Sequence, residues 1–296
     1  MTSPRHLSLF LTLGLFWGVS PSLYQHWGML GMPVSHVIVL TGIGVAAALA
    51  LICQLRGIDW IGGKQLHVFG LGCAVLMNVP FALGLFFARH VPPTELALII
   101  STAPIVNYLV ALGTGRENAA PRRLLAILLG FLSTAILVIT RDGMLSGEVS
   151  WWLIAAFSLP ILYSAYNFFA AAWWPHGCHP MAAGVAESTW SGLLAVPFLL
   201  VLAPPWSPDQ LPLSAYWTVL LACGMWTLER IAFFTLIQEK GAVFTVQAVY
   251  LSTPAAVVIA LAFYGGADIW LFVSLAVLMG ALYLNNTGSA AKQTSA

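Results

Sequence analysis

Hydrophobic residues run along this chain in long blocks, and polar residues gather at the short connections between the blocks. Cutting the sequence at these connections predicts ten hydrophobic helices of about 20 residues, the length that crosses a bilayer. The expected ranges are 7–27, 34–54, 66–87, 94–113, 122–140, 151–172, 181–203, 214–236, 243–263 and 268–286. The connections leave no room for a separate soluble domain. The pattern therefore predicts an all-α membrane protein with ten transmembrane helices.

One stretch of the sequence occurs twice. Residues 95–104 read ELALIISTAP, and residues 245–254 read TVQAVYLSTP, with the same ending of small residues and proline. In both places a hydrophobic helix and a short charged elbow come first. Repetition at a fixed offset indicates a duplicated architecture. We therefore expect two five-helix repeats, residues 1–145 and residues 146–296.

The Lys and Arg residues predict the orientation, because cytoplasmic loops are enriched in them. With both termini cytoplasmic, eight basic residues lie inside and only Arg89 and Arg141 lie outside. The inside residues are Arg5, Arg56, Lys64, Arg116, Arg122, Arg123, Lys240 and Lys292. Five spans per half is an odd number, so the second half is expected to be inverted relative to the first. Transporters built in this way bind solutes between their two repeats.

Composition supports a membrane location. The 296 residues are 60% hydrophobic and 7% charged, whereas soluble domains carry about 25% charged residues. The first apolar segment, from Leu7 onward, is expected to be a membrane helix and not a cleaved signal peptide. A net charge of +1 without a basic cluster argues against nucleic acid as a partner. The four cysteines are scattered singly among apolar residues, so no disulfide framework is expected.

Several segments together carry a family resemblance. They are the Trp17-Gly18 pair, the hairpin that ends in STAP, the Gly115-Arg116-Glu117 elbow and the run LLGFLSTAILVIT in the fifth predicted span. With the ten spans and the duplication, the chain resembles the drug/metabolite transporter superfamily, EamA type. The resemblance implies a bacterial inner-membrane carrier, usually an exporter of small metabolites or amino acids, made of two five-helix repeats.

Charged residues inside the spans are the strongest candidates for function, because an ionised side chain facing lipid is costly. Glu187 lies inside the seventh span, with Trp190 and Ser191 on the same helical face. It is predicted to face the cavity, where it binds a cationic amine or exchanges a proton. The alternative is a structural carboxylate, hydrogen-bonded to serines and to helix backbone.

Glu229 and Arg230 are neighbours in the eighth span, so they are expected to point about 100° apart and not in one direction. Arg230 is a candidate for holding a substrate carboxylate as a bidentate donor, with Trp226 one turn away. The alternative is a structural ion pair of Arg230 with Glu187 or with Glu229.

Two further glutamates lie near the ends of spans. Glu95 follows Thr94, and a Thr N-cap with an acidic first turn is ordinary helix-start chemistry; the alternative is a gate or a proton entry point. Glu117 lies beside three arginines and is expected to be a solvated loop charge. The two candidates for proton coupling are Glu187 and, under this alternative, Glu95.

Aromatic and amide side chains are expected to line the cavity. A buried amide needs partners, so it either joins helices or meets a polar substrate. The remaining substrate-binding candidates are Trp17, Asn78, Tyr163, Asn167, Trp190, Trp226, Gln247 and Tyr250. Four prolines, Pro80, Pro104, Pro160 and Pro254, are expected to bend helices around the cavity.

No cofactor, metal or catalytic residue is expected. His176, Cys178 and His179 supply three ligand types on one elbow but no fourth, which favours a polar loop over a metal site. A Gly-rich phosphate loop is missing from the sequence, so ATP is not expected to drive the chain. No set of nucleophile, base and orienting residue stands out either.

The sequence thus predicts a secondary transporter that exports a small organic metabolite, such as an amino acid, by alternating access. Its expected partners are the solute and the lipid bilayer, and a homodimer is left open. A multidrug or lipophilic-cation exporter is the first alternative. A membrane enzyme acting on lipid-linked substrates and a channel are the others.

Overall fold

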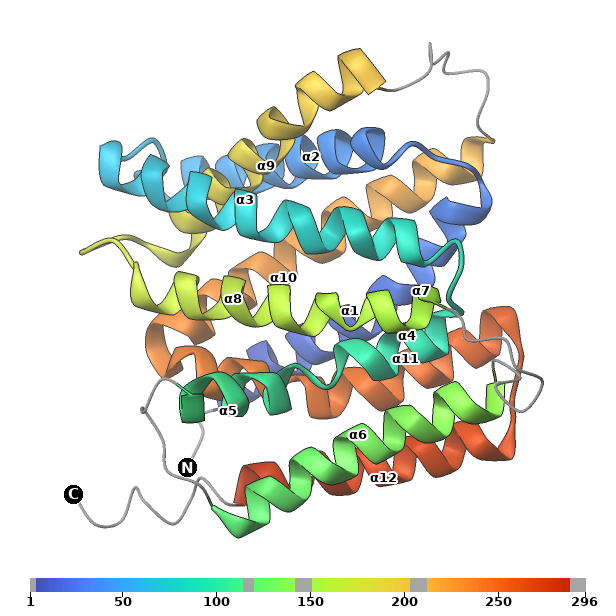
Figure 1. The fold of residues 1–296 in the computed structure, drawn as a ribbon. Helices are drawn as coiled ribbons and strands as arrows, with labels where there is room; N and C mark the ends of the chain where they lie inside the picture. The colour runs from blue at the N-terminus through green and yellow to red at the C-terminus, as the bar shows by residue number, and fades with distance from the viewer. Residues whose placement is uncertain (1–3, 114–119, 142–150, 203–211, 288–296) are drawn as a thin grey trace.

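The computed structural model describes residues 4–113, 120–141, 151–202 and 212–287, and all regular structure in these ranges is helical (Figure 1). Within these ranges, eight helices or consecutive helix segments are long and apolar enough to cross a membrane. The chain is therefore an all-α, multi-pass membrane protein. The helices are α1 (Pro4–Met29), α2 (Val34–Leu55), α3 (Lys64–Phe87), α4 (Pro93–Ile100), α5 (Ala103–Gly113), α6 (Pro121–Arg141), α7 (Trp151–Ala156), α8 (Ser158–Ala172), α9 (Pro180–Leu202), α10 (Leu213–Val246), α11 (Val249–Tyr264) and α12 (Ile269–Thr287).

The outer surface of the helices is apolar. Leu200 and Val201 at the end of α9 are 77% and 78% exposed, and Phe263 at the end of α11 is 79% exposed. Large exposed apolar side chains occur along the other helices as well. Contiguous apolar surface is unusual on soluble monomers and is expected where lipid covers the protein.

Each of the ten predicted spans contains helix, but three of them are broken, and the break in the ninth lies between α10 and α11. The fourth consists of α4 and α5, separated at Ser101 and Thr102, and the sixth consists of α7 and α8, separated at Phe157. Pro104 and Pro160 lie in the first turns of α5 and α8, where the missing amide hydrogen is not needed. These two prolines therefore follow a break at the start of a helix and do not bend a continuous helix as expected.

The helix α10 extends beyond its predicted end at residue 236 and reaches Val246. Gly241 interrupts it with φ 79°, a left-handed conformation that glycine adopts without a Cβ clash. A further break at Gln247 and Ala248 separates α10 from α11. Glu229 and Arg230, which lie only six to seven residues before the predicted end of the span, therefore lie well inside α10.

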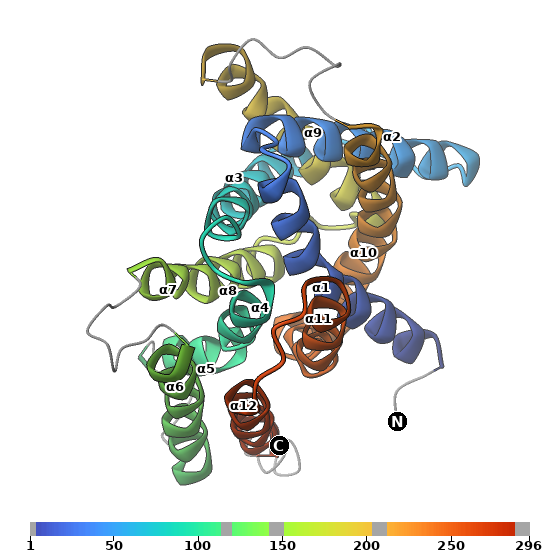
Figure 2. The ribbon, with the colours of Figure 1, turned by 90° about the vertical axis from the view of Figure 1, so that its right-hand side faces the viewer.

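The helices pack in three groups, which both ribbon views show (Figures 1 and 2). On one side α2 packs against α9, with α3 and α10 beside them. On the opposite side α6 packs against α12, and α1, α4, α8 and α11 lie between. Glycine permits the closest approach, since a Cβ at Gly42 of α2 would lie 2.7 Å from the backbone nitrogen of Gly192 in α9.

Candidate functional site

A cavity lies among the helices, with an empty volume of about 1200 Å³ including its open part. Residues of α1 to α5 and of α8 to α11 line it, so both predicted halves contribute. Most lining side chains are apolar or aromatic, and a few polar and charged groups lie among them. This composition is typical of a site for a small organic molecule.

One arginine and two carboxylates form the charged part of the lining. Arg230 Nε lies 3.1 Å from Glu187 Oε2, and Arg230 Nη1 donates a hydrogen bond of 2.8 Å to Glu229 Oε2. The Trp17 indole nitrogen donates to Glu229 Oε1 at 2.9 Å, and the Tyr166 hydroxyl donates to Glu187 Oε1 at 3.0 Å. Side chains of α1, α8, α9 and α10 thus form one polar network, with the Arg230 guanidinium between the two carboxylates.

The expectation that Glu229 and Arg230 face different directions was wrong. Their Cβ atoms do diverge on the helix, but both side chains are long enough to turn toward each other. The two alternative ion pairs proposed for Arg230, with Glu187 and with Glu229, are present at the same time.

The two carboxylates differ in the hydrogen bonds that they accept. Both oxygens of Glu229 accept hydrogen bonds, one from Trp17 and one from Arg230. Glu187 is 1% exposed, and its Oε2 accepts no hydrogen bond from the described residues, although it lies in ion-pair contact with Arg230. Glu187 therefore keeps an acceptor position that is not used within the described part of the chain.

Aromatic rings form two walls of the cavity. Tyr166 stacks on Phe233 with ring centroids 5.2 Å apart, close to the charged groups. The other wall is a row in which Phe81 contacts Tyr24 at 5.3 Å and Trp226 at 5.2 Å between centroids. Rings arranged in this way provide apolar contact and π faces to a ligand.

Six of the ten predicted substrate-binding residues line the cavity. They are Trp17, Tyr163, Asn167, Glu187, Trp226 and Arg230. The sequence reasoning missed Tyr166 and Ser188, which also line it. Tyr166 lies between Tyr163 and Asn167 in the sequence, and its i, i+3 spacing from Tyr163 was the signal for it.

The other four predicted binding residues do not line the cavity. Asn78 joins α3 to α9, because its amide nitrogen donates to the Ser191 carbonyl at 2.9 Å and its oxygen accepts from the Ser191 hydroxyl. The Tyr250 hydroxyl bonds to the backbone of α12. Trp190 packs beside His67, and Gln247 lies in the break between α10 and α11.

Glu95 is buried in the first turn of α4 and does not belong to the cavity lining. Its carboxylate accepts a hydrogen bond of 3.1 Å from the hydroxyl of Thr94. The N-cap position belongs to Pro92, which has no side-chain cap, so the expected Thr N-cap was wrong. Glu117 and the rest of the Gly115-Arg116-Glu117 elbow lie outside the described residues.

The elbow between α8 and α9 is tied by hydrogen bonds. His179 Nδ1 accepts from the Met181 amide, and the Cys178 carbonyl accepts from the Gln238 side chain. Among the described residues, no group of three or more His, Cys, Asp or Glu side chains could hold a metal ion. The four cysteines carry free thiols.

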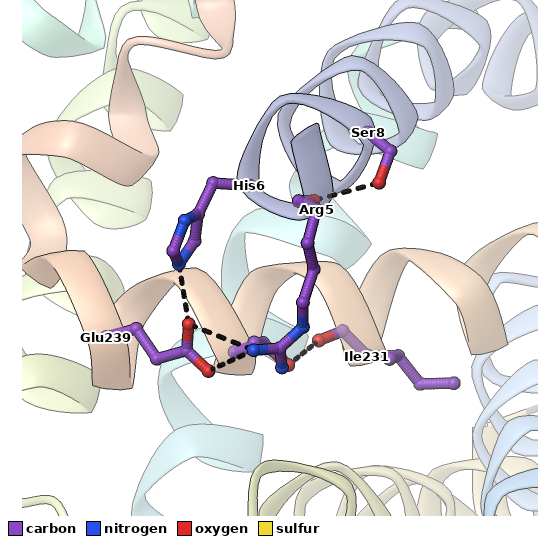
Figure 3. Close-up of polar contacts among 6 residues, drawn as sticks. Arg5, His6, Ser8, Ile231 and Glu239 are labelled. Carbon is purple, nitrogen blue, oxygen red and sulfur yellow. Dashed lines mark hydrogen bonds and ion pairs between the residues drawn. The ribbon is translucent and has the colours of Figure 1, made fainter. Parts of the chain in front are cut away.

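A second polar cluster joins the start of α1 to α10 (Figure 3). Glu239 lies 3.1 Å from Arg5 Nη1 and 2.6 Å from His6 Nε2. The rings of Phe10 in α1 and Phe244 in α10 also lie 5.6 Å apart. The two helices are therefore joined by an ion pair and by an aromatic contact.

Comparison with known proteins supports the fold alone. No family model and no curated protein matches the chain. Twenty-seven solved chains do match. One of them, a crystal structure with no stated function, aligns with the chain at a TM-score of 0.63 and 16% identity, covering 100% of both chains. The helical arrangement thus exists in other proteins.

Proposed function

We propose that this chain is a secondary transporter that carries a small organic solute across the bilayer by alternating access. The observation that carries the proposal is the cavity, which lies well inside α9 and α10 and combines charged, polar and aromatic side chains. In a membrane protein, ionisable residues in such a place mark a pathway for solutes or protons. A single chain surrounds the cavity, so one protomer is sufficient for transport.

The packing of the helices supports two inverted repeats as the moving parts. α3 packs against α8 and α9, while α10 packs against α1 and α2. A two-fold axis that exchanges α1 with α8, α2 with α9 and α3 with α10 converts the first set of contacts into the second. The contacts of α2 with α9, of α4 with α11 and of α6 with α12 join corresponding spans, so such an axis maps them onto themselves. Rocking of one half against the other would then expose the cavity to each side in turn.

The resemblance to EamA-type carriers adds the remaining parts of the proposal. They are ten spans, a bacterial inner membrane, cytoplasmic termini and export as the direction of transport. In this arrangement the cluster of Arg5, His6 and Glu239 lies at the cytoplasmic end of α1 and α10.

Counterflow in liposomes tests the carrier. A thermal-shift screen of amino acids, amines, nucleosides and lipophilic cations first selects a solute that stabilises the purified protein. Vesicles preloaded with this solute are expected to accumulate its labelled form transiently, with a rate that saturates. A flux that does not saturate would indicate a channel, and no flux for any stabilising solute would refute transport.

Two tryptophan substitutions make the test specific to the cavity. Ile100→Trp places a large side chain in the cavity lining and is expected to abolish counterflow. Leu221→Trp enlarges a side chain that is 58% exposed on the outer surface of α10, and it is expected to leave counterflow unchanged. Equal rates for both variants would show that the solute does not pass through this cavity.

A further inference from the structure

The lining of the cavity contains more carboxylates than cations. Its charged members in the described part of the chain are Glu187, Glu229 and Arg230. With all three ionised, the site carries one negative charge in excess. A buried charge without a counter-charge is unfavourable, so the site is completed by a proton or by a cationic ligand.

The hydrogen bonds decide which carboxylate is in excess. Glu229 is held on both oxygens and shares its helix with Arg230, so these two residues form a satisfied neutral pair. Glu187 receives one hydrogen bond from Tyr166 and has Oε2 without a hydrogen-bond donor among the described residues. The excess charge and the unused acceptor therefore belong to the same residue.

An ammonium group has the properties that this position requires. It supplies one positive charge and up to three N–H donors, and the Glu187 oxygen can accept one of them. The stacked rings of Tyr166 and Phe233 lie beside it and provide π faces for a cation. The row formed by Tyr24, Phe81 and Trp226 provides apolar contact for the rest of the ligand.

A carboxylate on the ligand would be disfavoured. It would have to compete with Glu187 and Glu229 for Arg230, whose Nε and Nη1 already face these two side chains. Adding a third carboxylate would also raise the negative charge of the site. The expected role of Arg230 in holding a substrate carboxylate is therefore the weaker interpretation.

We infer that the cavity binds monocationic amines with an aromatic or apolar body, with Glu187 as the counter-charge and Arg230 as its positioning partner. This inference rests on the proposed transport function for its physiological meaning, but binding can be measured without transport.

Three ligands that each contain a phenyl ring but differ in charge test whether the cavity prefers an ammonium group. Phenylethylamine carries only the ammonium, phenylalanine carries the ammonium and a carboxylate, and phenylpropionate carries only the carboxylate. Calorimetric titration of the purified full-length protein in nanodiscs is expected to give a Kd for phenylethylamine at least tenfold lower than for phenylalanine. No heat of binding is expected for phenylpropionate. Binding of phenylalanine or phenylpropionate as tight as that of the amine would overturn the inference.

Variants connect the preference to Glu187. Glu187→Gln is expected to weaken phenylethylamine binding at least tenfold. Glu239→Gln removes a carboxylate outside the cavity, and it is expected to leave the Kd unchanged. Unchanged binding in Glu187→Gln would refute the assignment. If that variant does not fold, the comparison of the three ligands on the native protein still decides the ligand class.

The outcomes separate this inference from the proposed function. Amine binding without counterflow would support the site and refute the carrier. Saturable counterflow of another solute, with no amine binding at millimolar concentration, would support the carrier and refute the ligand class.

Discussion

Removing Arg230 is expected to destabilise the protein far more than removing the charge of Glu187. Arg230→Met leaves Glu187 and Glu229 buried together with no counter-charge, at 1% and 3% exposure. Breaking a buried ion pair from one side typically costs about 3–5 kcal/mol. Glu187→Gln instead leaves Glu229 and Arg230 as a neutral pair, and the amide can turn its oxygen toward Arg230 and its N–H toward the Tyr166 hydroxyl, which can also accept. Its effect is expected to stay within about 1 kcal/mol.

Reversible unfolding in mixed micelles provides the measurement. The purified variants are titrated with increasing SDS, and far-ultraviolet circular dichroism follows the loss of helix. The double variant Arg230→Met/Glu229→Gln contains one buried carboxylate in place of two, so it is expected to recover about half of the lost stability or more. The effects of the two substitutions on the free energy of unfolding are therefore expected not to add, as is usual for residues that share one network.

Two results would refute the reasoning on charge. The first is an Arg230→Met variant as stable as the native protein, which would mean that water or lipid headgroups reach the two carboxylates. The second is a Glu187→Gln variant as unstable as Arg230→Met, which would mean that Glu187 is a required structural partner and not the carboxylate in excess.

Three other substitutions or reagents test the packing, the second polar cluster and the elbow. Gly42→Ala is expected to destabilise the fold by about 1–3 kcal/mol, because its Cβ would meet α9; Gly224→Ala, which has open space, is the control in the same unfolding assay. Glu239→Gln is expected to change the unfolding free energy by less than about 1 kcal/mol, since its ion pair with Arg5 is exposed to solvent. Burial raises the pKa of Cys178 to about 11. At pH 8 its thiolate fraction is about 200-fold below that of an ordinary cysteine. Higher nucleophilicity offsets about tenfold of this, so its reaction with a disulfide reagent, followed by mass spectrometry, is expected to be about 20-fold slower than that of a peptide thiol.

The long apolar helices could be predicted from the sequence because lipid imposes a length and an apolar composition on each of them. The breaks within spans were harder to place. Proline marks the region of a break, but the chain adjusts one or more residues before it, as at Ser101 and Thr102 ahead of Pro104. Gly241 shows the same limit, since a single glycine fits a continuous helix or a left-handed interruption.

The charged centre could be predicted in its members but not in its pairing. Glu187 and Arg230 are conspicuous because charged side chains are rare within apolar spans. Helical angles alone separated Glu229 from Arg230, because such angles describe Cβ directions and not the reach of long side chains. The amide of Asn78 was ambiguous for a related reason, since the rotation of α3 relative to α9 decides whether it meets a solute or the Ser191 backbone.

The arrangement of the charged centre suggests how occupancy could act on helix packing. The contact between Glu229 and Arg230 lies within α10, so this contact does not itself restrain α10, and the hydrogen bond from Trp17 to Glu229 joins α10 to α1. The contact of Arg230 with Glu187 does join α10 to α9, and the hydrogen bond of Tyr166 to Glu187 joins α9 to α8. In the proposed carrier, an ammonium or a proton on Glu187 weakens the restraint between helices and leaves the pair within α10 intact. A ligand changes a conformational equilibrium only through its different affinity for the two states. The Glu187 carboxylate can pair with Arg230 or with the ligand. It provides such a difference, because a ligand on Glu187 replaces the contact between Glu187 of α9 and Arg230 of α10.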